Sequence, residues 1–274
     1  QYDNFIVNGT VTLGSATLSL SGTYNPVTGD TFTIIANDGS DPVNGTFAGL
    51  PEGAVISNFL GSGAKATITY AGGDGNDVVI TVQPPEVSVS VSPSSVAEDG
   101  ATNLDFTFSR SGNTSGTLTV NFSVGGTATF NSDYTESGAD TFSATSGSVT
   151  FAAGSSTAVV TVDPTPDTTF ENNETVTLTI TSDPSYNPVA PTSATGTITN
   201  DDTAPTFSID DVTHNEGDAG TTSYTFTITK TGATALSALV DYETVNGTAV
   251  APGDFTAISP TTLTFAPGDT QMQI

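Results

Sequence analysis

The chain has 274 residues, of which 29 are acidic and only three are basic, so its formal net charge is −26. Such a charge disfavours binding to nucleic acid or to an anionic membrane surface. The absence of cysteine excludes disulfides and thiolate metal sites. No apolar run approaches the roughly 18 residues of a membrane helix, so we expect no membrane insertion.

Short runs in which apolar and polar residues alternate recur along the whole chain. Each run has a period of two residues and is bounded by Gly, Asn, Asp, Ser or Pro, as is typical of β-strands. In chain order the expected strands are VTLGSATLSL (11–20), TFTIIAN (31–37), VSVSVS (87–92), LDFTFSR (104–110), LTVNFSV (118–124), VVTV (159–162), TVTLTI (175–180) and YTFTITK (224–230). The sequence therefore predicts an all-β fold, with sandwiches, barrels or a β-solenoid as the candidate architectures.

Two proline-containing linkers divide the chain into three predicted segments. VQPPEV (82–87) and TAP (203–205) separate segments 1–83, 86–203 and 205–274. Because both linkers are short and stiffened by proline, we expect the segments to lie end to end with limited bending. Such an arrangement suits an extended rod better than a compact enzyme.

The second and third segments contain two copies of one domain type. AEDG (97–100), FTFSRSG (106–112), GGTATFNSDY (125–134) and VTFAAGSS (149–156) recur as NEGD (215–218), FTITKTG (226–232), NGTAVAPGDF (246–255) and LTFAPGDT (263–270). The truncated second copy lacks a counterpart of 161–202, so we expect an open sheet edge that is partly disordered or completed by a neighbouring molecule. We also expect the chain to be a piece of a longer protein.

Acidic residues of the middle segment gather in loops and at the ends of expected strands. They are Glu98, Asp99, Asp133, Asp167, Glu171, Glu174, Asp201 and Asp202. Loops of a sandwich meet at its two poles, where a hard cation such as Ca²⁺ could take its six to eight oxygen ligands at about 2.3–2.6 Å. The alternative is that each acid merely solvates a turn. The scarcity of basic partners favours a bound cation.

Residues 86–203 resemble a Calx-beta domain, the module named after the sodium–calcium exchanger. The matching stretches are AEDG, GTAT…SDY, VTFAAG, FENNETVTLTI and GTITNDD. Residues 205–274 resemble the first part of another copy. The resemblance implies Ig-like β-sandwiches in tandem that bind Ca²⁺ at one tip.

The resemblance also implies a set of metal ligands, carried over position by position. They are Glu98, Asp133, Asp167, Glu171, Asp201 and Asp202, together with Glu174 as a ligand or as a support for its loop. Weaker candidates are Asp99, Glu216, Asp254 and Asp77. Pro166, Thr168 and Asn200 stand where the densest calcium-binding members carry aspartates. We therefore expect fewer ions or weaker binding, on the order of 10⁻⁴–10⁻³ M, and at most a weak site in the last segment.

The first segment, 1–83, resembles the terminal coils and cap of a parallel β-helix in large bacterial autotransporter- or haemagglutinin-like surface proteins. The matching stretches are TYNPVTGDTFTIIANDG (23–39), GTFAGLPEGA (45–54) and ITYAGGDGNDVVITV (68–82). A separate sandwich is the alternative. GGDGNDVVI (72–80) also fits the nonapeptide of RTX calcium-binding β-rolls, in which Asp77 would be a ligand. Because such rolls need several stacked copies, a tight hairpin is the favoured interpretation.

These observations predict a structural, calcium-stabilised segment of a bacterial extracellular or cell-surface protein of the adhesin type, rather than an enzyme. The single histidine, His214, lies in a loop without a GxSxG motif, and no tryptophan platform accompanies the paired carboxylates. Expected partners are neighbouring domains of the same chain, further copies of it, or a host or cell-surface ligand. Alternative functions are a self-assembling filament subunit completed by a neighbouring chain and an accessory module of a secreted hydrolase. Adaptation to high salt is a competing explanation of the acidity.

Overall fold

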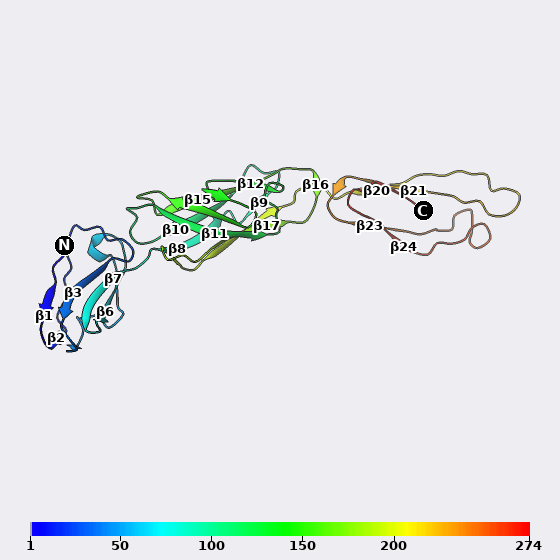
Figure 1. Ribbon diagram of the computed structural model, residues 1–274. Coiled ribbons are helices and arrows are strands. Elements are labelled where there is room, and N and C mark those ends of the chain that lie inside the picture. The colour runs from blue at the N-terminus through cyan, green and yellow to red at the C-terminus, as the bar shows by residue number, and fades with distance from the viewer. Residues whose placement is uncertain (1) are drawn as a thin grey trace. The chain divides into compact units, whose positions relative to one another are not determined.

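The computed structural model describes residues 2–274, and β-strands account for nearly all of its regular structure (Figure 1). Within that range the single helical element is a 3-10 turn, η1 (Phe59–Gly61). The all-β prediction is therefore confirmed. No helix in the described range has the length and apolar character needed to cross a membrane.

The first segment forms a mixed sheet over its own small core. Its strands are β1 (Phe5–Val7), β2 (Val11–Thr12), β3 (Thr31–Asn37), β4 (Val43–Asn44), β5 (Val55–Ile56), β6 (Ala66–Gly72) and β7 (Asp77–Val82). Five of them are ordered β1-β3-β7-β6-β5. The β1–β3 and β2–β4 pairs are parallel, whereas the others are antiparallel. Whether this segment caps a β-helix stays a prediction.

The strand expected over 11–20 is wrong beyond its first two residues. Gly14 and Ser15 adopt positive φ angles of 56° and 65°, which bend the chain directly after β2. Leu13, Leu18 and Leu20 nevertheless pack against the core of this segment. The alternation of leucines therefore predicted correctly which side chains face the core. It predicted wrongly that their backbone pairs with a neighbouring strand.

The favoured hairpin interpretation of 72–80 agrees with the structure. β6 and β7 are antiparallel, and Gly72 pairs with Asp77 across the turn. Gly73 has a φ angle of 56°, and a Cβ atom at this position would collide with the Asp77 carboxylate. Glycine is therefore required here for both backbone conformation and space.

The middle segment is a β-sandwich. Its strands are β8 (Glu86–Ser92), β9 (Ser95–Ala97), β10 (Leu104–Arg110), β11 (Leu118–Gly126), β12 (Tyr134–Ser137), β13 (Thr141–Phe142), β14 (Ser146–Phe151), β15 (Thr157–Pro164), β16 (Thr169–Phe170), β17 (Glu174–Ile180), β18 (Asn187–Pro188) and β19 (Ser193–Thr199). One sheet has the order β12-β15-β10-β8-β18, and the other has the order β13-β14-β11-β17-β19-β9. Alternate residues of β10 and β11 point into the core, where the rings of Phe108 and Phe122 lie 5.3 Å apart.

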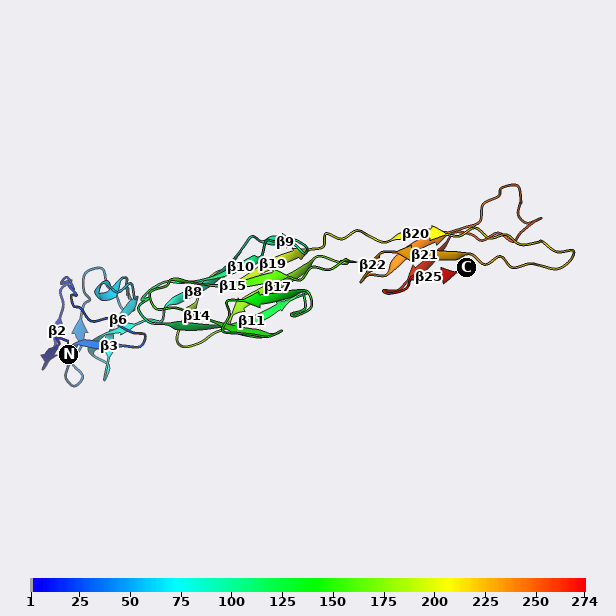
Figure 2. The same ribbon diagram turned by 90° about the horizontal axis from the view of Figure 1, so that it is seen from above.

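The last segment forms two small sheets. Its strands are β20 (Thr206–Ile209), β21 (Thr227–Thr231), β22 (Ala233–Thr234), β23 (Ala238–Tyr242), β24 (Thr261–Phe265) and β25 (Gln271–Gln273). β20, β21 and β25 lie side by side (Figure 2), and β23 pairs with β24. Phe265 is fully buried, and the centroid of its ring lies 5.1 Å from that of Phe207. The strand expected over 224–230 begins only at Thr227.

Two compact units can be distinguished within the chain. The first comprises residues up to Ser94, Asn103–Asp163 and Thr175–Gly196. The second comprises Ser95–Thr102, Pro164–Glu174 and Thr197–Ile274. The second unit therefore contains three acidic loops of the middle segment together with the last segment. The boundaries 83/86 and 203/205 stay predictions.

Candidate metal centre

Two paired strands bring two of the acidic loops together. β9 and β19 are parallel, with Thr197 opposite Ser95 and Thr199 opposite Ala97. Parallel strands end at the same edge of a sheet, so the residues that follow them become neighbours. The pairing continues for one more step, because the backbone N–H of Glu98 donates to the carbonyl oxygen of Thr199 at 3.0 Å. Glu98 and the terminal NDD stretch (200–202) therefore leave the sheet together.

Three carboxylates converge beside this edge. Oxygens of Glu98, Asp167 and Glu171 all lie within 4.8 Å of one another. Glu98 is only 4% exposed, whereas Asp167 is exposed and Glu171 is half-buried. Two of these residues come from the loop on either side of β16, and the third follows β9. The site therefore combines one buried carboxylate, that of Glu98, with two more accessible ones.

The electrostatics of the cluster favour a cation. Burial, reinforced by the charges of Asp167 and Glu171 and then of Asp202 and Asp99, raises the pKa of Glu98 to about 7. The pKa of Asp202 is also raised, first by desolvation and then by Asp99, Asp167 and Asp201. Burial together with the proximity of like charges produces such shifts, and a divalent cation reverses them.

The side chain of Asp202 gives a second indication that this site binds a ligand. Its Oδ2 atom is buried and has no hydrogen-bond partner among the described residues. A buried carboxylate oxygen without a donor is costly and is normally satisfied by a proton, water or metal. Its charge also acts on the pKa of Glu98, and that of Asp167 acts on its own pKa, so Asp202 lies near the three converging carboxylates.

Asn200 organises the loop that carries Glu171. Its side-chain oxygen accepts the backbone N–H of Glu171 at 2.9 Å, and its Nδ2 donates to the carbonyl oxygen of Asp202 at 3.2 Å. Its own backbone N–H donates to Oδ1 of Asn173 at 3.1 Å. The family resemblance presents Asn200 only as a position where an aspartate ligand is missing, so this positioning role was not predicted. An amide between two acidic loops is the signal that could have suggested it, because an amide both donates and accepts.

The other predicted ligands of the middle segment lie outside the converging trio. Asp99 and Asp201 are exposed, and the backbone N–H of Asp99 donates to Oδ1 of Asp201 at 3.4 Å. Glu174 is half-buried at the start of β17. Asp133 belongs to the first unit, where its carboxylate accepts the backbone N–H of Thr129. Their ligand roles stay predictions.

A comparison with known families decides the family of this chain. The sequence model of the Calx-beta domain matches residues 76–203 and again residues 200–274. The chain belongs to the Calx-beta family.

Solved structures similar to the chain include Calx domains. A crystal structure of CBD12 from CALX1.2 shares 18% identity, over 69% of this chain and 74% of that chain, with a TM-score of 0.35. A structure of the calcium binding domain CBD12 of CALX1.1 shares 20% identity over 68% and 73%, with a TM-score of 0.34. A crystal structure of an apo-form Calx CBD1 domain shares 20% identity over 42% of this chain and 98% of that chain, with a TM-score of 0.34. A search of curated proteins gave no significant match.

Membership of the Calx-beta family confirms two predictions. The chain contains calcium-binding β-domain modules of Ig-like fold, and Ca²⁺ is the cation of this family. The family consists of regulatory calcium-binding modules rather than catalytic domains. Glu98, Asp167, Glu171 and Asp202 fit this cation because they offer several hard oxygen donors and an unpartnered buried oxygen.

The second Calx-beta repeat repeats one loop of the first but not its carboxylate cluster. Oδ2 of Asp254 accepts the backbone N–H of Val250 at 2.8 Å, as Asp133 does from Thr129. Glu216 is exposed. Within the described residues, no group of three potential metal-binding side chains forms in this repeat. Whether this repeat holds a weak site stays a prediction.

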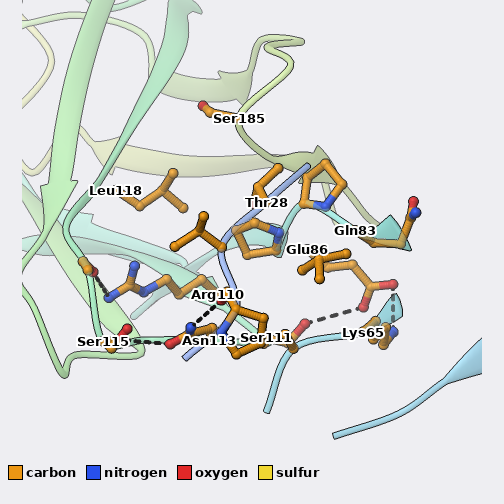
Figure 3. A pocket seen from close by; sticks show the side chains of 18 of the residues that line it. Thr28, Lys65, Gln83, Glu86, Arg110, Ser111, Asn113, Ser115, Leu118 and Ser185 are labelled. Carbon is orange, nitrogen blue, oxygen red and sulfur yellow. Dashed lines mark hydrogen bonds and ion pairs between the residues drawn. The ribbon is translucent and has the colours of Figure 1, made fainter. Parts of the chain in front are cut away.

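A cavity of about 300 Å³ in the first unit is a different kind of site. Lys65, Glu86 and Arg110 line it (Figure 3). The Lys65 ammonium pairs with Glu86 at 2.7 Å. The Arg110 guanidinium donates to the carbonyl oxygens of Ser155 and Gly116, among others, and lies over the ring of Phe151. Both cations therefore have partners within the fold.

Proposed function

We propose that the chain is a calcium-stabilised structural segment of a bacterial extracellular surface or adhesin-like protein, in which Ca²⁺ rigidifies a junction between β-domains. The observation that carries the proposal is a loop with two roles. The loop that holds Asp167 and Glu171 also contains β16, and β16 pairs with β22 of the following Calx-beta repeat.

The contact between this loop and the next repeat is specific in register. Thr169 lies opposite Ala233 and Phe170 opposite Thr234 in a parallel pair. The Thr234 hydroxyl donates to the carbonyl oxygen of Phe170 at 2.9 Å, and the Ala235 N–H donates to the same oxygen at 3.1 Å. Glu171 is the next residue along the chain. Any change that fixes Glu171 therefore also fixes the segment that receives the next repeat.

Without a cation, the clustered carboxylates favour separation of the loops that carry them. Burial, and after it the repulsion between like charges, raises the pKa values of Glu98 and Asp202 and so disfavours their ionised forms. Bound Ca²⁺ neutralises this charge. Glu98, Asp167 and Glu171 would hold it, with Asp202 beside them. The loop would then be held against β19 and would present Thr169 and Phe170 in the geometry that pairs with β22.

The cellular setting is proposed from the sequence. The segment that precedes the two Calx-beta repeats resembles the end of a β-helix in large bacterial surface proteins. The strong acidity and the lack of cysteine suit a calcium-rich exterior in which metal, rather than disulfides, provides rigidity. Neighbouring domains of the same chain are the proposed partners, and no catalytic activity is proposed. The filament and hydrolase-module alternatives stay predictions.

Calcium titration of the chelator-treated chain tests the proposal. We expect saturable heat by isothermal titration calorimetry and a higher melting temperature. We also expect slower hydrogen exchange at the backbone amide of Ala235, which contacts the β16 loop. Glu98→Gln should weaken binding at least tenfold. Asp140→Asn, which neutralises an exposed acid elsewhere in the same repeat, should leave binding unchanged.

Two outcomes would overturn this function. Absence of calcium binding by the full chain would remove its basis. Calcium binding without any change in exchange at 233–235 would separate the ion from the junction. Titration with NaCl at matched ionic strength is the control. Screening by NaCl acts on all charges alike, so an effect seen with CaCl₂ and not with NaCl is specific to Ca²⁺ rather than a general adaptation to salt.

A further inference from the structure

The first segment places a polar loop and a polar turn side by side, far from the Calx-beta carboxylates in sequence. β3 ends at Asn37 and β7 begins at Asp77. The two strands are antiparallel, with Ile35 opposite Val78. The end of β3 and the start of β7 therefore lie at the same edge of the sheet. Loop 38–41, which follows β3, meets turn 73–76, which precedes β7.

Two asparagines join this loop and this turn, and both are buried. Asn37 is 5% exposed and Asn76 is 6% exposed. Nδ2 of Asn76 contacts the carbonyl oxygens of Asp38, Gly39 and Asp41 at 3.2, 3.3 and 2.9 Å. Nδ2 of Asn37 donates to the same Asp41 carbonyl oxygen at 2.7 Å. Both amide groups are thus directed at the loop.

These contacts fix the orientation of each amide. A carbonyl oxygen accepts hydrogen bonds and cannot donate, so the nitrogen of each asparagine must face the loop carbonyls. Both amide nitrogens contact the Asp41 carbonyl oxygen, so the two amide groups, with Oδ1 of Asn37 and Oδ1 of Asn76, are neighbours. Both oxygens are buried without a hydrogen-bond partner among residues 2–274. Two buried acceptors without a donor, on two amide groups that share one carbonyl partner, are unusual in a folded protein.

The surrounding charge is negative. Oδ1 of Asp77 accepts the backbone N–H of Asn37 at 2.9 Å, and Asp77 directly follows Asn76 in the chain, which places its carboxylate near both asparagines. Asp38 and Asp41 lie in the loop itself. The three basic residues of the chain are Lys65, Arg110 and Lys230, and none belongs to this loop or turn. The site therefore has acceptor oxygens in excess, with no cationic side chain of the loop or turn to balance them.

We infer that Oδ1 of Asn37, Oδ1 of Asn76 and the carboxylate of Asp77 form a calcium site in the first segment, independent of the Calx-beta site. Carboxylate and amide oxygens are ligands that Ca²⁺ prefers, and water completes its coordination of six to eight oxygens. With three protein ligands, the dissociation constant is on the order of 10⁻⁴–10⁻³ M. Unlike an RTX roll, the site needs no stacked copies, because a hairpin and a loop of one segment supply its ligands.

Ordered water is the competing occupant, because a water molecule could donate to both oxygens. The test therefore measures binding in the full chain carrying Glu98→Gln, which weakens the Calx-beta site. CaCl₂ is titrated while the side-chain amide signals of Asn37 and Asn76 are followed by ¹H–¹⁵N NMR. We expect both signals to shift and to saturate at millimolar Ca²⁺.

Asp77→Asn is the decisive variant, because asparagine keeps an oxygen for the N–H of Asn37 but removes the charge. We expect it to abolish saturation of the two amide signals. Asp74→Asn, an exposed acid in the same turn, should preserve saturation. Far-UV circular dichroism in chelator verifies that both variants fold. If Asp77→Asn does not fold, the NMR titration of the parent chain still decides.

Two results would overturn the inference. One is the absence of saturable shifts at Asn37 and Asn76, which would leave water as the occupant. The other is saturation that survives Asp77→Asn unchanged. Neither result affects the Calx-beta site, which is followed separately through hydrogen exchange at the Ala235 amide.

Discussion

The side chain of Asn200 accepts the backbone N–H of Glu171 at 2.9 Å, and thereby ties the end of β19 to the loop that pairs with the next repeat. The same side chain donates to the carbonyl oxygen of Asp202. One neutral residue therefore positions acidic residues of two loops without adding a further negative charge.

Replacement of Asn200 by aspartate tests this balance. An aspartate still accepts the Glu171 N–H, but it loses the bond to the Asp202 carbonyl and adds a charge to a crowded site. We expect Asn200→Asp to lower the free energy of unfolding without calcium by about 1–3 kcal/mol and to tighten calcium binding. Chemical denaturation in chelator and calorimetry with CaCl₂ measure the two effects. Equal affinity in both proteins would show that Asn200 does not border the ion.

Neutralisation of the buried acid has the opposite pair of effects. Glu98→Gln removes the most buried carboxylate of the cluster. Above pH 7 the metal-free variant should be more stable than the parent, by on the order of 1–3 kcal/mol, because an ionised buried acid is lost. Its calcium affinity should fall at least tenfold. A metal-free variant less stable than the parent at high pH would show that ionised Glu98 is stabilised by contacts other than calcium.

Much of the fold could be predicted from the alternation of apolar residues, but not all of it. TFTIIAN and LDFTFSR coincide with β3 and β10 residue for residue. The alternation over 11–20 failed as a strand because Gly14 and Ser15 turn the chain, while Leu18 remains in contact with the core. Periodicity reports which side chains are buried, and it does not report whether the backbone finds a partner strand.

The sequence was sufficient to predict which acidic residues are candidate ligands, but not which of them lie together. The loops that carry acids were identified from the sequence and the family resemblance, and the structure brings Glu98, Asp167 and Glu171 together. Sequence spacing could not rank these residues above Asp133, because the distance between loop side chains depends on strand register. It also could not show that Asn200 bonds to Glu171, since that contact spans 29 residues.

The metal-free protein should lose stability as the pH rises through neutrality. Glu98 has a pKa of about 7 in the folded protein, against an ordinary value of 4.5. Its raised pKa contributes stability that is complete below the ordinary value and is lost as the pH rises through about 7. Asp202 acts in the same direction. The loss attributable to Glu98 is on the order of 3 kcal/mol between about pH 4 and about pH 8.

Thermal unfolding in chelator across this pH range measures the effect. The slope should flatten in Glu98→Gln, which cannot titrate, and it should reverse when saturating calcium is present because the ion binds the ionised form. A metal-free stability that rises from pH 5 to pH 8 would contradict the assignment of Glu98 as the dominant titrating group of the cluster.

The hydrogen bond between repeats should transmit calcium binding. The Thr234 hydroxyl donates to the Phe170 carbonyl oxygen at 2.9 Å, and Thr234 is only 7% exposed. Thr234→Val keeps the shape of the side chain but removes the hydroxyl, which donates to Phe170 and accepts the N–H of Leu236, and this should cost about 0.5–1.5 kcal/mol of stability for each bond lost. It should also reduce the calcium-dependent protection of the Ala235 amide from hydrogen exchange, with little change in calcium affinity.

Thr213→Val, at an exposed position of the last segment, is the matched control and should change neither the stability nor this protection. If Thr234→Val lowers stability but leaves the calcium-dependent protection intact, the pairing of β16 with β22 is a static contact, and the ion does not control the junction.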